Sequence, residues 1–305
     1  MRLLVFLLLC AGAAAPATRD TRKTIEVFFW VSGGEQIHQS AIAASVNGKS
    51  APVVGLLEPA SDLVLLLVLD MVGDLSQVSP AQDALARQLA ELPPNVLVGL
   101  LRAQDGLRVL TDPSADRERL VQEIRTLAVS GRAGLLDTVE TVMRIGDSIL
   151  SASRVRVAVL YVTDSDVTNY REDFTNPVVN SSDTRDLTRR FPQSLVREKI
   201  AKLSSSISAT QTPLFIVHLH YRNDALNEAY QTGLLELSSN SGGRAEFSRT
   251  LADIPEMIGS AFRAALGLYS AEIALPQGAG RQLSVSLVTA GRTINHRTRF
   301  QLREK

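Results

Sequence analysis

The alternation of apolar strands with amphipathic helices constrains this chain more than any other feature. Residues 64–69 and 157–162 form continuous apolar runs, and each run is followed within two residues by an aspartate, Asp70 or Asp164. Strands that are apolar on both sides must be covered on both faces, which happens when helices flank a parallel sheet. We therefore expect an α/β fold with a doubly wound, mostly parallel sheet. The expected strands are 64–70, 96–103, 107–112, 155–164 and 213–220, and the expected helices are 80–92, 115–128, 134–150 and about 252–267.

Both ends of the chain have a different, strand-rich pattern. Residues 24–31 are β-branched and aromatic, as strands prefer. Asn47-Gly48 lies between two short apolar runs and predicts a hairpin, because both positions of a type I′ turn need positive φ. We expect the two ends to pair into one small antiparallel β unit. The predicted divisions are 1–17 (export signal), 18–59 (first part of the β unit), 60–268 (α/β domain) and 269–305 (second part of the β unit).

The composition excludes several classes of protein. Of the 305 residues, 45% are hydrophobic and 21% are charged, which is usual for a folded chain. The 32 basic residues balance the 32 acidic ones and are scattered, whereas a nucleic-acid surface gathers Lys and Arg. The single cysteine, Cys10, lies in the expected export signal. The mature chain therefore has no disulfide, no thiolate nucleophile and no cysteine-based metal site.

Residues 1–17 contain the three parts of an export signal. Arg2 supplies the positive start, residues 3–10 the apolar run, and Ala15-Pro16-Ala17 a small-residue cleavage site. The apolar run is shorter than the ~20 residues that a membrane span needs. We expect a secreted or periplasmic protein that begins at Thr18 and has no membrane span.

The carboxyl ends of the expected strands are the place to look for a functional site. Ligands of open α/β sheets bind at that edge, where Asp70 and Asp164 stand. Residues 165–194 follow one of these strands and are rich in Asp, Asn, Thr and Ser. They are expected to form a polar insertion at the same edge.

The order of these features resembles the von Willebrand factor A family, and within it a group of secreted bacterial proteins. The resemblance rests on the two strands that end in aspartate, a GLLDTV segment after a glycine-containing loop, and a strand-rich opening with a hairpin at 46–49. A GGR sequence at 242–244 and an Asp-containing helix start at 251–255 extend it toward the carboxyl end. The resemblance covers nearly the whole mature chain. It implies a von Willebrand A-type sheet and a role in binding proteins.

The resemblance also implies a position for a metal site. The family's ligands are read as D-x-S-x-S after the first strand, a Thr in the loop before a helix, and the Asp of a TDG motif. Aspartates are kept at the first and last of these positions, but the neutral hydroxyl ligands between them are changed. The matching positions of this chain are Asp70, Val72, Asp74, Ala133 and Thr163-Asp164, with Ser165 in place of the motif's Gly.

These changes alter what the implied metal site can bind. Val72 and Ala133 offer no side-chain oxygen, and Asp74 adds a negative charge. Mg²⁺ demands near-octahedral oxygen geometry, so we expect weak Mg²⁺ binding or none. Without a metal ion, Asp70 is expected to cap nearby loop amides. The substitution Asp74→Ser is expected to leave the stability of the fold unchanged or slightly higher, because it relieves repulsion among three carboxylates in one crevice. The alternative is a Ca²⁺ ion held by Asp70, Asp74 and Asp164, since Ca²⁺ tolerates irregular carboxylate shells.

Two further patterns suggest chemistry. Gly146 to Ile149 has the letters of a GDSL esterase block, which makes Ser148 a candidate nucleophile, but the segment lies in a helical pattern and no His has an Asp three positions before it. His218 and His220 share one face of a strand, as zinc ligands would, without a recognisable third ligand. Polar strand-end residues explain the two histidines more simply.

The sequence thus predicts a secreted, non-enzymatic protein-binding or scaffolding module that needs no cofactor. The expected contact surface is the carboxyl edge of the sheet, and the partner is an unidentified protein, not a nucleic acid. One alternative is cation-dependent adhesion through Asp70, Asp74 and Asp164, with Ca²⁺ or Mg²⁺. The other is a serine hydrolase that uses Ser148. The residues expected to contact the partner are Asp70, Asp74, Asp164 and Asp166, together with the 165–194 insertion.

Overall fold

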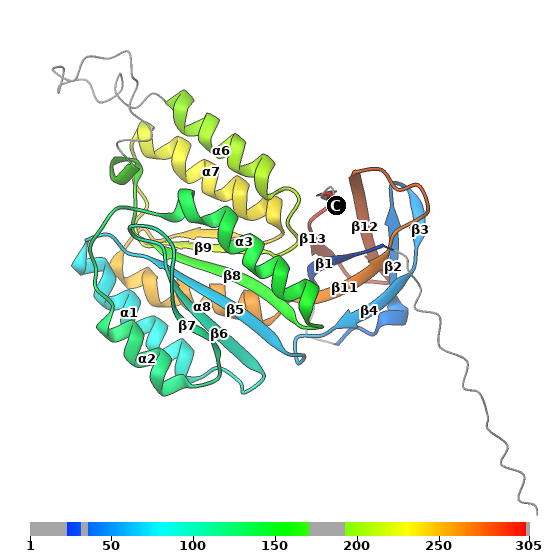
Figure 1. Cartoon of the computed structure of the whole chain (residues 1–305), viewed down its shortest axis with the longest axis horizontal. Coiled ribbons are helices and arrows are strands. Elements are labelled where there is room, and N and C mark those ends of the chain that lie inside the picture. The colour runs from blue at the N-terminus through cyan, green and yellow to red at the C-terminus, as the bar shows by residue number, and fades with distance from the viewer. Residues whose placement is uncertain (1–22, 32–35, 171–192, 303–305) are drawn as a thin grey trace, which may run out of the picture.

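The computed structural model describes residues 23–31, 36–170 and 193–302 (Figure 1). The predicted export signal and most of the predicted insertion lie outside the described residues. A six-stranded sheet in the order β10-β9-β8-β5-β6-β7 forms the centre of the larger unit, and only β7 runs antiparallel to its neighbour. The strands are β5 (Leu63–Asp70), β6 (Val96–Arg102), β7 (Arg108–Ser114), β8 (Arg156–Thr163), β9 (Leu214–His218) and β10 (Ala245–Phe247).

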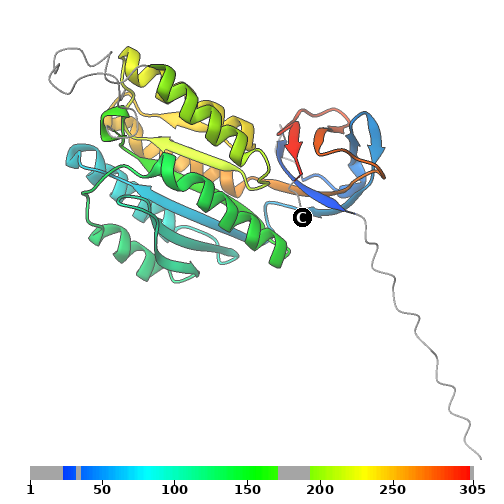
Figure 2. The ribbon, with the colours of Figure 1, turned by 45° about the horizontal axis from the view of Figure 1, so that its top comes forward.

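Helices cover both faces of this sheet (Figures 1 and 2). The odd-numbered side chains of β5, such as Leu65 and Leu67, pack with α1, α2 and α8, and the even-numbered ones, such as Leu66 and Val68, with α3, α6 and α7. This alternation produces two apolar cores from one continuous apolar run. The predicted doubly wound α/β fold is confirmed. The helices are α1 (Leu75–Ala90), α2 (Arg117–Thr126), α3 (Leu135–Ala152), α6 (Gln193–Ile207), α7 (Ala225–Ser241) and α8 (Ile254–Leu266), with short 3₁₀ turns η1 (Gln39–Ala41), η2 (Val167–Tyr170) and η3 (Leu251–Asp253).

The helix predictions need two corrections. Helix α1 begins at Leu75 rather than Pro80, because Asp74 caps its first turn and the proline is accommodated inside the helix. Helices α6 and α7 were not predicted from the sequence. Helix α6 buries only Val196, Ile200 and Ile207 among its described apolar positions and carries a run of serines, so its apolar stripe is narrow.

The two ends of the chain pair with each other, as predicted. Strand β1 lies between β11 and β13, and β12 lies between β2 and β14, so each of two four-stranded sheets combines both ends. Asn47 and Gly48 have φ values of 51° and 75°, as the predicted hairpin requires. The division of the chain into domains at 59/60 and 268/269 stays a prediction. The strands are β1 (Thr24–Val31), β2 (Ile42–Val46), β3 (Lys49–Ala51), β4 (Val53–Leu57), β11 (Tyr269–Ala274), β12 (Gln282–Thr289), β13 (Ile294–His296) and β14 (Arg299–Gln301).

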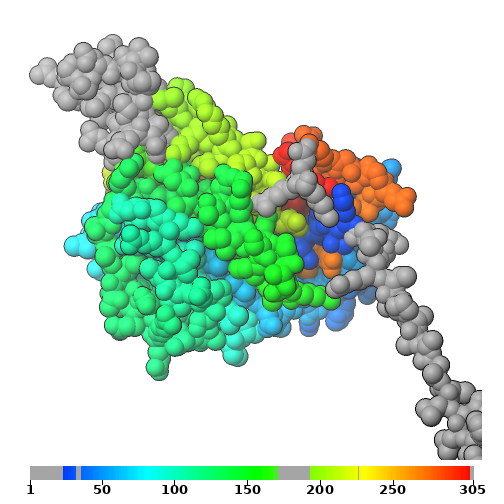
Figure 3. Space-filling model, in the orientation of Figure 1, coloured from blue at the N-terminus to red at the C-terminus, as the bar shows by residue number. Residues whose placement is uncertain are grey.

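The β unit is attached at the amino ends of the central strands. Figure 2 shows these strands pointing away from the β unit, and Figure 3 shows the two units in contact along one side of the α/β domain. The indole nitrogen of Trp30 donates to the carbonyl of Ala264 at 2.9 Å, and an Arg297 guanidinium nitrogen donates to the carbonyl of Thr210 at 2.6 Å. The carboxyl edge of the sheet therefore lies at the end of the molecule away from the β unit.

Candidate functional site at the carboxyl edge of the sheet

Asp70 ends β5 with a carboxylate that accepts four hydrogen bonds. Its Oδ1 accepts from the amide of Gly134 at 2.8 Å, and its Oδ2 accepts from the amide of Leu135 at 3.2 Å and from the hydroxyls of Thr163 at 3.1 Å and Ser165 at 3.2 Å. The side chain is fully buried. Burial raises the pKa of Asp70 to about 6, although the hydrogen bonds act in the opposite direction. Asp70 thus caps loop amides, as the sequence predicted.

Asp164 performs the same task for a second loop. Its carboxylate accepts from the amides of Val72 at 2.6 Å, Gly73 at 3.2 Å and Asp74 at 3.1 Å. Only 6% of the residue is exposed. The loop that carries the first family motif is therefore wrapped around this carboxylate, and position 72 contributes its backbone rather than a side chain.

Asp74 points in a third direction, onto its own helix. Its carboxylate accepts from the amide of Ser76 at 3.0 Å, from the hydroxyl of Ser76 at 2.6 Å and from the side-chain amide of Gln77 at 2.8 Å. These are the contacts of an N-cap. The hydrogen bond from the Ser76 side chain lowers the pKa of Asp74.

The three carboxylates therefore do not share one ligand shell. Each accepts hydrogen bonds from a different segment, and Ala133 supplies no side-chain oxygen. Within 23–31, 36–170 and 193–302, no group of three or more His, Cys, Asp or Glu side chains is arranged to hold a metal ion. The donor set does not fit the octahedral shell that Mg²⁺ requires.

Asp74→Ser is expected to lower the free energy of unfolding by at most about 0.5 kcal/mol, and Asp74→Ala by about 1 kcal/mol. The sequence suggested that removing this charge would relieve repulsion, but the lowered pKa indicates that the surroundings favour the carboxylate. Serine keeps an N-cap acceptor, whereas alanine has none. Urea unfolding of both variants with EDTA, Mg²⁺ or Ca²⁺ checks this. A loss that appears only with a cation would contradict it.

Asp166 is buried in an ion pair. Its Oδ2 lies 2.7 Å from the Nε of Arg222, and only 5% of the residue is exposed. Asp70 and Asp164 are buried as well. Of the four carboxylates predicted to contact a partner, only Asp74 is exposed. The other three side chains present almost no surface to a partner, and partner contact at these four positions stays a prediction.

His218 and His220, at the carboxyl edge of the sheet, both form hydrogen bonds within the protein. The His218 Nε2 lies 2.7 Å from the carbonyl of Ser165, and its Nδ1 accepts from the amide of His220 at 3.2 Å. Burial lowers the pKa of His218 to about 4, so the ring is neutral at pH 7. The Nδ1 of His220 lies 2.8 Å from the side-chain nitrogen of Gln77. These contacts agree with polar strand-end residues and leave His218 without a free nitrogen for a metal.

An exposed surface surrounds these buried groups, and we name it the edge patch: Leu75, Tyr221, Arg249 and Leu251. The exposed fractions of Leu75, Tyr221 and Leu251 are 67%, 37% and 50%. The Arg249 guanidinium lies over the Tyr221 ring, 5.5 Å from its centre. The contact of His220 with Gln77 ties the Tyr221 loop to α1, and η3 packs against α1. The patch thus combines the first residue of α1 with the segments that follow β9 and β10.

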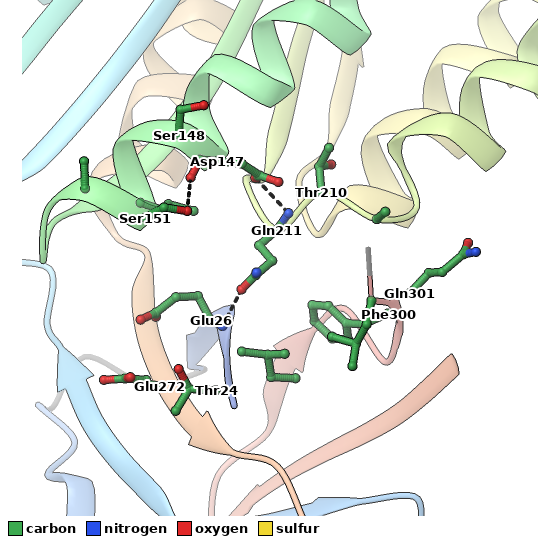
Figure 4. A pocket seen from close by; sticks show the side chains of 15 residues that line it. Thr24, Glu26, Asp147, Ser148, Ser151, Thr210, Gln211, Glu272, Phe300 and Gln301 are labelled. Carbon is green, nitrogen blue, oxygen red and sulfur yellow. Dashed lines mark hydrogen bonds between the residues drawn. The ribbon is translucent and has the colours of Figure 1, made fainter. Parts of the chain in front are cut away.

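The candidate nucleophile Ser148 lies at the other end of the molecule. It lines a cavity of about 710 Å³ between the end of α3 and the β unit (Figure 4). Its hydroxyl donates to the carbonyl of Arg144 at 2.9 Å, inside the helix. The neighbouring Asp147 carboxylate accepts from the amide of Gln211 at 2.9 Å. Among the described residues, no histidine lines this cavity, and the Ser148 hydroxyl is engaged with its own helix.

Comparison with known proteins gives matches to solved structures only. No family model matches the chain, and no curated protein matches it. A von Willebrand factor type A protein from Catenulispora acidiphila is similar over 93% of this chain and 74% of its own, with 11% identity and a TM-score of 0.48. The PilB minor pilin from Streptococcus sanguinis is similar over 72% of this chain and 64% of its own, with 12% identity and a TM-score of 0.48. An aerotolerance-related membrane protein from Bacteroides fragilis is similar over 67% of this chain and 99% of its own, with 10% identity and a TM-score of 0.40.

The fold is von Willebrand A-like. This statement rests on the strand order, the single antiparallel edge strand and the two helical layers described above. In the described part of the chain, no helix has the length and apolar character needed to cross a membrane.

Proposed function

We propose that this protein is a secreted, non-enzymatic module that binds a protein partner through the edge patch and needs no cation to do so. The observation that carries the proposal is the patch itself. Large apolar side chains, an aromatic ring and an arginine lie on segments that follow three strands, at the edge where α/β sheets bind their ligands. Tyr and Arg are over-represented among the residues that dominate binding energy in protein interfaces.

The proposed independence from cations is supported by the hydrogen bonds of the carboxylates. Asp70 and Asp164 are buried and accept from two and three backbone amides respectively. A cation would have to compete with these donors, and nearby hydroxyl ligands are missing at Val72 and Ala133. Cation-dependent adhesion is therefore the weaker alternative. The secreted location rests on the sequence of residues 1–17 alone.

The absence of catalysis is supported by the surroundings of Ser148. Its hydroxyl is bonded within α3, and the cavity it lines brings no histidine to it. A serine nucleophile needs a base within hydrogen-bond reach. The hydrolase alternative would be established if the protein turned over model esters and Ser148→Ala abolished that turnover.

Tyr221→Ser is expected to weaken partner binding at least tenfold, because it removes an exposed ring and the support of the Arg249 guanidinium. The measurement is quantitative recovery of co-purified protein from the native organism, with EDTA and with Mg²⁺. Val54→Ser is the matched control, since Val54 is 48% exposed on the β unit. Recovery that is unchanged by Tyr221→Ser, or equally reduced by Val54→Ser, would contradict the proposal.

A further inference from the structure

We infer that the partner segment held by the edge patch is acidic and apolar: a carboxylate pairs with Arg249 while neighbouring apolar side chains cover Leu75 and Leu251. This inference rests on the proposed function and names the chemistry of the partner. It follows from the hydrogen-bonding groups that the patch leaves unused.

Arg249 is the group with the most unused capacity. Its side chain is exposed, and its guanidinium contacts the ring of Tyr221, 5.5 Å away. Among the described residues, no carboxylate forms an ion pair with it. A guanidinium has five N–H donors in a planar fork that matches a carboxylate. The stacked ring holds that fork in place, which lowers the entropy lost on pairing.

The two carboxylates nearest to Arg249 in sequence, Glu246 and Asp253, already have partners inside the protein. Glu246 lies 2.9 Å from an Arg244 guanidinium nitrogen. The Oδ2 of Asp253 accepts from the amides of Arg249 at 3.3 Å and Thr250 at 2.9 Å, as part of a capping box before α8. It thereby stabilises the turn rather than the guanidinium. The positive charge of Arg249 is left for a group from outside.

The carboxylates of Asp166 and Asp74 already have hydrogen-bond or ion-pair donors inside the protein. Asp166 faces Arg222 at 2.7 Å, and Asp74 accepts from Ser76 and Gln77. The patch therefore offers a free donor at Arg249 and acceptors that are already in use. A partner that binds here must supply an acceptor, and a carboxylate is the acceptor that a guanidinium pairs with most strongly.

The apolar part of the partner follows from the exposed side chains beside this arginine. Leu75 and Leu251 are 67% and 50% exposed. Covering them removes apolar surface from water, which favours association. A segment that alternates acidic and apolar residues satisfies both requirements, whereas a basic segment would place like charges against Arg249.

The test uses three labelled ten-residue peptides: alternating Asp-Leu, alternating Lys-Leu and alternating Asp-Ser. Fluorescence anisotropy with the full mature protein should show that the Asp-Leu peptide binds at least about tenfold more tightly than either of the others. Arg249→Gln should weaken its binding about tenfold, and Arg119→Gln, a change at an exposed arginine of α2, should leave it unchanged. Raising the salt concentration should weaken binding to the unmutated protein more than to Arg249→Gln.

Four results would overturn the inference. The Lys-Leu peptide could bind most tightly, all three peptides could bind equally, none could bind, or Arg249→Gln could leave the binding of the Asp-Leu peptide unchanged. These outcomes are distinguishable from failure of the proposed function. If co-purification of the native partner depends on Tyr221 while the peptides show no acidic preference, the edge patch binds a partner of different chemistry. If neither depends on the patch, both proposals fail.

Discussion

Arg156→Met is expected to lower the free energy of unfolding by about 3–5 kcal/mol, because it removes a buried guanidinium that four carbonyl oxygens share. The side chain is fully buried at the start of β8. Its Nη1 donates to the carbonyls of Leu266 at 2.8 Å and Leu268 at 2.9 Å, and its Nη2 donates to those of Pro59 at 2.6 Å and Ser61 at 2.7 Å. One side chain therefore ties together both connections between the α/β domain and the β unit.

Methionine fills a similar volume but donates no hydrogen bond, so buried carbonyl oxygens lose a donor. Urea unfolding gives the difference in free energy, and Arg119→Met in α2 serves as an exposed control that should change it by less than about 0.5 kcal/mol. Equal stability of Arg156→Met and the unmutated protein would show that the junction does not depend on this residue.

Asp70→Ala is expected to lower the free energy of unfolding by about 2–4 kcal/mol, and to do so equally in EDTA and in Mg²⁺. The change leaves the buried amides of Gly134 and Leu135 without an acceptor. The hydroxyl of Thr163 can donate to that of Ser165, 2.7 Å away, and the Ser165 hydroxyl can donate to the Tyr230 hydroxyl, 3.2 Å away. A loss confined to Mg²⁺ would mean that Asp70 acts through a bound ion instead.

The pH dependence of stability gives a second measurement on Asp70. Its folded-state pKa of about 6 lies above the ordinary aspartate value of 3.8, so the contribution of this group is fully present below pH 3.8 and is lost as pH rises through 6. Acidification from pH 7 to pH 4.5 therefore stabilises the fold through Asp70. Asp70→Asn cannot take up this proton, and it should lose more stability over that interval than the unmutated protein.

His218 acts in the opposite direction and supplies an internal check. Its folded-state pKa of about 4 lies below the ordinary histidine value of 6.5, so its contribution is present above pH 6.5 and is lost as pH falls through 4. In the unmutated protein, acidification is stabilising through Asp70 and destabilising through His218. The combined contribution of these two groups to the free energy of unfolding should therefore change little between pH 7 and pH 4.5.

Much of the fold could be predicted because its signals are local. The apolar run at 64–69 alternates between two cores, and Asn47-Gly48 forms the turn that its residue types favour. The start of α1 could not be placed, because Pro80 is a residue type that favours a first turn while the actual cap is Asp74. From the sequence alone, an aspartate is equally compatible with a helix cap, a metal ligand or a strand end. Its role depends on which residues lie next to it in the folded structure.

At the candidate site, too, features set by local sequence could be predicted, and features that depend on tertiary contacts could not. Capping of loop amides by Asp70 could be expected from its place at a strand end, and the structure supplies Gly134 and Leu135 as the donors. The edge patch could not be predicted. Tyr221 and Arg249 are far apart in sequence and meet only because β9 and β10 are neighbours. Exposed residues of this kind follow no periodic pattern, so the sequence gives no signal for them.

Site-specific photo-crosslinking in the native organism tests the central claim most directly. A photoreactive side chain placed at Leu251 lies on the edge patch, and one placed at Val54 lies on the β unit, at similar exposed fractions of 50% and 48%. We predict a discrete crosslinked protein from position 251, insensitive to EDTA, lost in Tyr221→Ser and not formed from position 54. A crosslink from position 54 but not from 251, or one from 251 that disappears in EDTA, would contradict cation-independent binding at the carboxyl edge.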